Sequence, residues 1–177
     1  MLIMGKLFYI MGKSASGKDT IYQRLLRNPE FSLERLVIYT TRPIRDGELD
    51  GREYHFVTEE DFQKLKAEGK IIEDRGYETV YGLWRYFTAD NMNLGEKNYL
   101  GIGTLESYEK LKAYYGEEKI RPIYIEVEDG ERLKRAIARE ETQEVPKYEE
   151  MCRRFLADAQ DFSEEKIRQA GIDCRFS

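Results

Sequence analysis

The spacing of apolar and polar residues predicts a mixed α/β protein. Short apolar runs predict strands at 7–11, 35–39, 98–102, 122–127 and 172–175. Other apolar residues recur with helical spacing and predict helices over 17–27, 104–115, 130–141 and 147–170. Strands separated by helices of about ten to fifteen residues are typical of βαβ units, so we expect a five-stranded parallel central sheet.

The segment from about 40 to 93 does not follow this alternation of strands and long helices. Its shorter patterns predict strands at 54–57, 71–73 and 79–81, and helices over 59–68 and 83–93. Thr58 and Asp61 give the first of these helices a capping-box pattern, and Gly69 follows its end. We therefore expect a small α+β insert between 40 and 93, and a core built from 1–39 and 94–177.

Composition and charge narrow the class of protein. The chain has 177 residues, which favours one domain with a sizeable core. Its net charge of −5 argues against a general nucleic-acid binder, because no basic excess neutralises a phosphate backbone. The apolar runs are too short for a membrane span, and the first residues lack a signal-peptide pattern. Two cysteines without metal spacing fit free thiols, so we expect a cytoplasmic protein. The oligomeric state stays open.

A glycine-rich segment after the first predicted strand has the pattern of a P-loop. Glycines at both ends let the backbone wrap around phosphate oxygens, while backbone N–H groups, the following helix terminus and a lysine supply positive charge. The predicted ATP-phosphate contacts are Gly12, Lys13, Ser14, Ala15, Ser16, Gly17, Lys18, Asp19 and Thr20. The position after the lysine, where a Ser or Thr usually meets Mg²⁺, is Asp19 here.

A second phosphate site is predicted at residues 42–54. Arg42 and Arg45 flank Pro43 in a rigid turn that can present two planar guanidinium groups, and Tyr54 adds a hydroxyl. A phosphotransferase needs two such sites, one for the donor and one for the acceptor.

The stretch from Thr40 to Val57 resembles the acceptor segment of the guanylate kinase family, T-T-R-x-x-R-x-G-E-x-x-G-x-x-Y-x-F-V. The resemblance covers nearly the whole chain. It implies a P-loop NTPase fold with three α/β/α layers, a nucleoside-monophosphate-binding insert and a helical lid near 136–149. It also implies the reaction ATP + GMP to ADP + GDP, with Mg²⁺ as the cofactor of ATP.

The resemblance further implies the acceptor contacts. Residues matching Arg42, Arg45 and Tyr54 hold the GMP phosphate in the family, Glu48 lies near that pocket, and Tyr81 closes over the phosphate. Glu73 matches the glutamate that accepts hydrogen bonds from guanine N1 and N2. One carboxylate suits those two adjacent donors, whereas adenine would leave it badly paired.

The chain departs from the family pattern at four positions. Ile38 and Leu83 are apolar where the family has hydroxyl side chains, and Gly101 and Gly103 replace two acids. We hypothesise that Asp19 supplies the missing carboxylate toward Mg²⁺, through a metal-bound water, because Mg²⁺ is commonly held by one or two carboxylates plus substrate oxygens.

Several arginines lie on the last two long helices. The resemblance implies that Arg135, Arg139 and Arg154 contact the transferring phosphoryl group, where arginine can contribute about 10³-fold or more. For Arg132 and Arg153 we expect a solvated helix face with ion pairs, and we assign Trp84 to packing.

Two other functions stay open. One is a kinase for another nucleoside or deoxynucleoside monophosphate, which the changes at Leu83, Gly101 and Gly103 motivate. The other is a non-catalytic guanylate-kinase-like module that binds a phosphorylated partner. Such modules typically lose the P-loop, whereas this chain keeps Gly12, Gly17 and Lys18.

Overall fold

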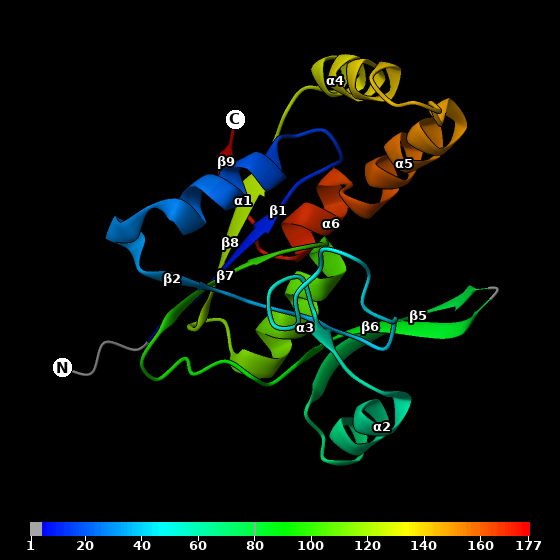
Figure 1. Cartoon of the computed structure of the whole chain (residues 1–177). Coiled ribbons are helices and arrows are strands. Elements are labelled where there is room, and N and C mark those ends of the chain that lie inside the picture. Colours follow the sequence, from blue (N-terminus) through cyan, green and yellow to red (C-terminus); the bar gives the residue numbers. More distant parts are fainter. Residues whose placement is uncertain (1–4, 80) are drawn as a thin grey trace.

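Five parallel strands form the central sheet in the computed structural model, which describes residues 5–79 and 81–177. The strand order is β2 (Leu33–Arg35), β7 (Asn98–Ile102), β1 (Leu7–Met11), β8 (Ile120–Ile125) and β9 (Arg175–Phe176). Each neighbouring pair is parallel. The predicted parallel sheet is therefore confirmed, with β1 at its centre (Figure 1).

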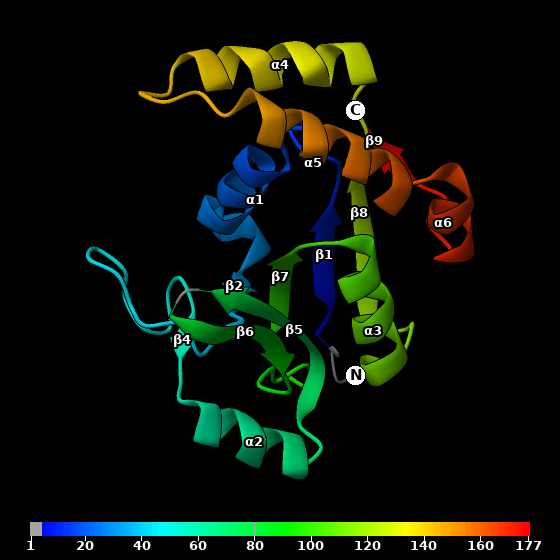
Figure 2. The ribbon, with the colours of Figure 1, turned by 90° about the vertical axis from the view of Figure 1, so that its right-hand side faces the viewer.

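Helices cover both faces of this sheet, because successive side chains of β1 point to opposite sides. Ile10 packs on one face, against helix α1 (Lys18–Arg27). Leu7, Tyr9 and Met11 pack on the other face, against α3 (Leu105–Tyr115) and α6 (Glu164–Gln169). The three-layer α/β/α prediction is thereby confirmed, and the layers separate clearly in Figure 2.

A second, smaller sheet lies beside the first. Its order is β4 (His55–Phe56), β3 (Tyr39–Thr40), β6 (Gly82–Ala89) and β5 (Ile71–Thr79). Helix α2 (Glu59–Ala67) packs on it through Phe62, which is fully buried against Phe87 and Ala89. Thr58 and Asp61 form the predicted capping box at the start of α2.

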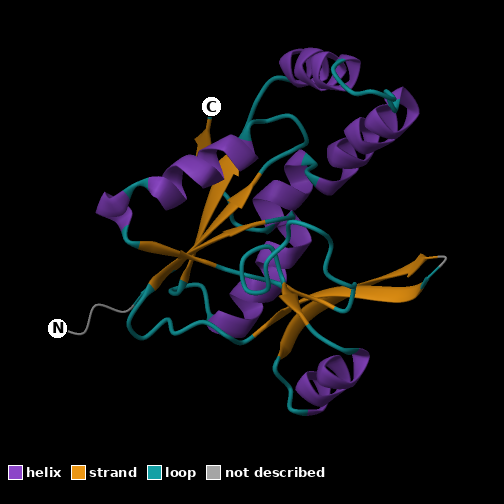
Figure 3. Ribbon diagram, viewed as in Figure 1, coloured by secondary structure: helices purple, strands orange, loops and turns teal. Residues whose placement is uncertain are grey.

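The prediction of a helix over 83–93 is wrong. Residues 82–89 form strand β6, which pairs antiparallel with β5 in one long hairpin (Figure 3). Phe87 and Ala89 turn to the buried α2 face, while Trp84 and Tyr86 turn to the other face. Aromatic and β-branched residues favour such a half-buried pleated surface over a helix.

Three other boundaries differ from the predictions. The apolar run at 35–39 is divided between β2 and β3, which belong to different sheets. The predicted strand at 71–73 begins the longer strand β5, which ends at Thr79, so the predicted strand at 79–81 is wrong: Tyr81 lies in a turn and residue 80 lies outside the described part of the chain. The predicted helix 147–170 is two helices, α5 (Tyr148–Asp161) and α6, because Ser163 caps α6 by accepting from the Lys166 N–H.

The remaining elements follow α1 and β8. A 3-10 turn (Pro29–Phe31) follows α1, and α4 (Asp129–Glu141) follows β8. In Figure 1, α4 and α5 extend from the upper end of the sheet, and the β5–β6 hairpin projects from the same side below them. Within the described residues, no helix combines the length and apolar character needed to cross a membrane.

Candidate active site

The loop between β1 and α1 has the backbone geometry of a phosphate-binding loop. Gly17 has a φ of 87° and Ala15 a φ of 61°, so the chain turns through left-handed conformations before α1 begins. A Cβ on Gly12 would lie 2.8 Å from the Ile125 carbonyl oxygen, so glycine is required there by close packing of the loop on β8. The loop therefore places the N-terminus of α1 where it can accept an anion.

Charged side chains border this loop. The Lys18 ammonium lies 3.5 Å from the Asp19 carboxylate, and their side chains are 21% and 83% exposed. Lys13 lies 3.5 Å from Asp129. Ser16 is buried in the loop, and its hydroxyl has no hydrogen-bond partner among the described residues. The partly exposed Lys18 ammonium is available to a phosphate group, whereas the Ser16 hydroxyl is enclosed by the loop.

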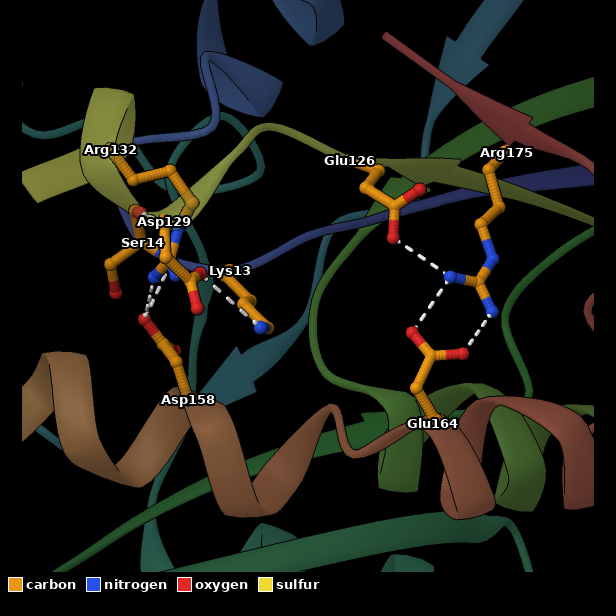
Figure 4. A network of polar contacts seen from close by, with 8 residues as sticks. All are labelled: Lys13, Ser14, Glu126, Asp129, Arg132, Asp158, Glu164 and Arg175. Atoms are coloured by element: carbon orange, nitrogen blue, oxygen red, sulfur yellow. Dashed lines mark hydrogen bonds and ion pairs between the residues drawn. The ribbon is translucent and has the colours of Figure 1, made fainter.

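The loop is fixed from behind by a buried ion pair. Arg132 in α4 donates to the Ser14 carbonyl at 3.0 Å, to Asp129 at 2.6 Å and to Asp158 at 2.9 Å. Asp158 in α5 also accepts the Ser14 N–H at 2.8 Å (Figure 4). The expectation of a solvated Arg132 is wrong, because this side chain is only 1% exposed.

A sequence signal for this ion pair existed. Arg132 lies four residues before the buried Ala136, on the same stripe of α4. Asp158 continues the inward stripe of Met151 and Phe155 on α5. A charged residue within each of two facing apolar stripes indicates a buried pair.

The turn that contains Arg42 brings a guanidinium, a carboxylate and two aromatic rings together. Arg42 is 3% exposed and makes two parallel hydrogen bonds to Glu48, at 3.0 and 2.8 Å. Its guanidinium lies 5.5 Å from the ring centres of both Tyr54 and Phe56. These hydrogen bonds raise the pKa of Arg42 and, together with the Arg45 N–H, lower the pKa of Glu48. Glu48 thus orients Arg42 beside Tyr54.

The other predicted phosphate contacts lie further out. The side chain of Arg45 is exposed, and its N–H donates to Glu48 at 2.8 Å. Tyr81 is 82% exposed and stacks on Trp84, with ring centres 6.1 Å apart and planes at 7°. Trp84 is therefore partly a platform for Tyr81 rather than core packing alone.

Glu73 lies on the same face of β5 as Arg75 and Tyr77, which line an aromatic cavity. Its carboxylate is buried, and Oε1 accepts from the Thr88 hydroxyl at 3.0 Å. The Arg75 Nε lies 3.7 Å from Oε2, which is longer than a hydrogen bond. The adjoining cavity, of about 400 Å³, is lined by Ile38, Tyr54, Arg75, Tyr77, Trp84 and Tyr86.

The guanylate kinase family model matches residues 4–166. The chain belongs to the guanylate kinase family. The guanylate kinase of Wolbachia sp. subsp. Brugia malayi is 34% identical over 125 residues, covering 68% of this chain and 61% of that protein. The guanylate kinase of Wolbachia pipientis wMel is 31% identical over 157 residues, covering 88% of this chain and 75% of that protein.

A solved structure agrees with the fold. The crystal structure of guanylate kinase from Anaplasma phagocytophilum superimposes with a TM-score of 0.58 at 23% identity, covering 98% of this chain and 76% of that one. At this identity the likeness shows the fold.

The glycines at 101 and 103, which replace two acids of the guanylate kinase pattern, have a structural explanation that the sequence did not give. A Cβ on Gly101 would lie 2.6 Å from the Tyr9 ring, and a Cβ on Gly103 would overlap the Tyr9 hydroxyl. Tyr9 therefore fills the space in front of β7 where family members carry acids. Burial raises the pKa of Tyr9, and the nearby charge of Glu73 raises it further.

The predicted lid arginines of this family member divide into two groups. Arg139 and Arg154 line a cavity of about 90 Å³ between α4 and α5, together with Ser14 of the phosphate loop. Arg135 pairs instead with Glu131 at 3.0 Å, and its side chain is 47% exposed. The structure thus brings two of the three arginines to the loop.

Glu150 in α5 holds two neighbouring arginines. It accepts from Arg153 at 2.7 Å and from Arg154 at 2.8 Å, and these hydrogen bonds lower its pKa to about 2. Arg153 is 64% exposed, as expected for a solvated side chain. Arg154 is therefore held in place on the helix face that lines the cavity.

Proposed function

We propose that this protein transfers the γ-phosphoryl group of ATP to GMP, producing ADP and GDP. The observation that carries the proposal is the buried Glu73 carboxylate, whose Oε2 accepts no hydrogen bond from the described residues. It lies on the face of β5 whose Arg75 lines a cavity together with Tyr54. An intact phosphate loop on the same domain supports a phosphoryl donor. The combination fits a monophosphate kinase better than a simple nucleotide-binding protein.

The donor half binds the phosphates of ATP. The backbone N–H groups of residues 15–20 and the Lys18 ammonium form the binding surface for the phosphates. The exposed Thr20 lies in the first turn of α1. Arg132 and Asp158 do not contact ATP in this proposal. They hold Ser14, so the loop keeps its shape without reorganisation when the phosphates bind.

The acceptor half binds GMP at its phosphate and at its base. Arg42, oriented by Glu48, and the Tyr54 hydroxyl bind the GMP phosphate, with Arg45 and Tyr81 joining from the exposed side. Glu73 accepts from guanine N1 and N2 through its free oxygen and the remaining lone pair of Oε1. The opposite charges of the two contacts orient the nucleotide along the cavity.

Transfer of the phosphoryl group spreads charge over its equatorial oxygens. Arg139 and Arg154 line the cavity next to Ser14, and they stabilise this charge. Arg135 joins them when the lid, residues 136–149, closes over the bound nucleotides. The GMP phosphate oxygen attacks the γ-phosphorus directly, and the bond to the ADP oxygen breaks without a covalent enzyme intermediate.

Mg²⁺ fits the donor half through Asp19. Its carboxylate is 83% exposed at the loop, beside Lys18, and Mg²⁺ needs only one or two protein carboxylates when phosphates supply other ligands. Tyr9 fills the space of the family's acidic pair, and no cluster of three or more possible metal ligands occurs within 5–79 and 81–177. When bound, Mg²⁺ neutralises charge on the ATP phosphates.

A coupled assay across all ribonucleoside and deoxyribonucleoside monophosphates tests the proposal. We expect kcat/KM for GMP to exceed that for AMP by about 10³-fold or more, because adenine leaves the Glu73 carboxylate unpaired. If GMP turns over no faster than the other monophosphates, the acceptor is a different nucleotide. If no acceptor turns over although ATP raises the Tm, the chain is a binding module.

The proposal also divides the domain into three parts: a core of residues 1–39 and 94–177, an insert of residues 40–93 and a lid of residues 136–149. It further assigns the protein a role in purine nucleotide metabolism in the cytoplasm.

A further inference from the structure

Arg75 lies on the same face of the β5–β6 hairpin as Glu73. Residues 73, 75 and 77 alternate to one side of β5, and their partners across the ladder are Thr88, Tyr86 and Trp84. Arg75, Tyr77, Trp84 and Tyr86 all line the cavity of about 400 Å³. One face of the hairpin therefore carries a carboxylate and, two residues further toward the tip, a guanidinium.

The guanidinium of Arg75 has hydrogen-bond donors without protein partners. Its Nε is buried, and no acceptor within the described residues bonds to it. Glu73 lies 3.7 Å away, so the two side chains attract each other without forming a hydrogen bond. A buried donor without a partner costs free energy, which a ligand acceptor can recover.

The chemistry of guanine requires donors in this cavity. Its N1 and N2 edge carries donors, whereas its O6 and N7 edge carries two acceptors. Ile38 is apolar and lines the cavity without a donor, and Leu83 projects from the face of β6 opposite to that of Trp84 and Tyr86. Arg75 presents the planar fork that matches O6 and N7, and two bonds of this kind are the commonest specific contact to guanine.

We propose that Arg75 determines base specificity by donating hydrogen bonds to O6 and N7 of guanine, while Glu73 accepts from N1 and N2. This inference rests on the proposed function and adds a residue to it. Adenine carries an amino group in place of O6, so its donor would face the Arg75 donors. The two side chains thus reject adenine independently, and their opposite charges leave the base site nearly neutral.

A purely structural role for Arg75 makes a different prediction. The same side chain lines a neighbouring cavity with Glu106, Glu109, Asp161 and Lys166, where it could serve only as a counter-ion. A counter-ion would not distinguish substrates that differ at one ring atom. Arg75→Lys keeps the charge without the planar fork, and Arg75→Met removes both while keeping much of the apolar stem.

The experiment compares GMP with 7-deaza-GMP, which lacks the N7 acceptor, and with IMP, which lacks the N2 amino group. Wild-type protein should show kcat/KM about tenfold lower for 7-deaza-GMP than for GMP. Arg75→Met should lower kcat/KM for GMP by about 10- to 100-fold and abolish the difference between GMP and 7-deaza-GMP. The ratio of GMP to IMP should stay unchanged, because it reports on Glu73. Arg153→Met, at an exposed arginine, is the matched control.

The outcomes separate the two proposals. If wild-type protein uses 7-deaza-GMP as well as GMP, Arg75 does not contact N7 and the inference is wrong, whether or not any variant folds. If Arg75→Met, folded as judged by its Tm, lowers kcat/KM for GMP and for 7-deaza-GMP by the same factor, Arg75 is a counter-ion. The same conclusion follows if Arg75→Lys restores activity with GMP without restoring the preference for GMP over 7-deaza-GMP. If wild-type protein does not phosphorylate GMP at all, the proposed function itself is wrong and this inference falls with it.

Discussion

The guanidinium of Arg132 in α4 donates to the carboxylate of Asp158 in α5 at 2.9 Å, and each side chain also bonds to the backbone of Ser14. Helices α4 and α5, which lie between β8 and β9 in the chain, are thereby tied to the loop that follows β1. The ring of Phe155 lies 4.8 Å from the same guanidinium and shields it from water. The shape of the phosphate loop consequently depends on residues more than a hundred positions away.

Removing this guanidinium should destabilise the protein. Arg132→Met leaves the half-buried Asp158 carboxylate without its cation, and the loss of one partner of such a pair costs about 3 kcal/mol. Urea denaturation measures the free energy of unfolding, and the KM for ATP should rise as Ser14 loses its support. Arg153→Met removes an exposed arginine and should cost less than about 1 kcal/mol. Equal effects of the two variants would contradict a supporting role for Arg132.

The contact between Tyr9 and Gly103 should appear as coupling between mutations. Gly103→Ala places a methyl group against the Tyr9 hydroxyl, and we expect a loss of about 1–3 kcal/mol. In the Tyr9→Phe background most of that loss should disappear, because the clashing oxygen is gone. Gly101→Ala is the control, since it meets ring carbons that phenylalanine keeps. Additive losses at Gly103 and Tyr9 would show that they are not in contact.

The ion pair of Glu48 with Arg42 predicts a pH dependence of stability. The pKa of Glu48 is lowered in the folded protein, so the stabilisation is fully present above the ordinary value of 4.5 and is lost as pH falls through the folded pKa. Wild-type protein should therefore exceed Glu48→Gln in Tm at pH 7, and the difference should shrink below pH 4.5. The KM for GMP should rise in the variant at pH 7. A difference in Tm that grows on acidification would contradict this account.

The proposed role of Asp19 predicts a change in metal dependence. Asp19→Ser should raise the Mg²⁺ concentration for half-maximal turnover severalfold, because one carboxylate near the ATP phosphates is lost. Asp173→Ser, which removes an exposed carboxylate near the C-terminus, is the control. Unchanged Mg²⁺ dependence in Asp19→Ser would show that Asp19 does not compensate for the missing acids.

The two arginines that line the cavity beside Ser14 should act on the rate. Arg139→Ala and Arg154→Ala should each lower kcat by about 10²-fold or more while changing the free energy of unfolding little, since both side chains are exposed. Arg153→Ala removes an arginine of the same helix that does not line this cavity, and it should retain kcat. If Arg154→Ala and Arg153→Ala lower kcat by the same factor, the cause is a change in α5 as a whole and not the loss of an arginine from the cavity.

Local sequence patterns were sufficient for the core of the fold and for the glycine loop between β1 and α1. The strand at 7–11, the glycine loop and helix α1 are contiguous, and glycine, proline and capping residues act within a few positions of themselves. The same holds for Thr58 and Asp61 at the start of α2. The match of residues 40–57 to a known acceptor segment likewise depends only on neighbouring residues.

Other features depended on contacts between distant segments. The residues of β6 have a spacing that fits an amphipathic helix, and only pairing with β5 and packing of Phe87 on α2 made them a strand. Gly101 and Gly103 replace acids of the family pattern, and only the fold shows that Tyr9, more than ninety positions earlier, fills the space in front of them. A side chain's burial is set by what the fold brings against it. The sequence by itself therefore determined which chemical groups this protein has, and the tertiary structure decided that Arg132 supports the loop and that Arg75 lines the aromatic cavity.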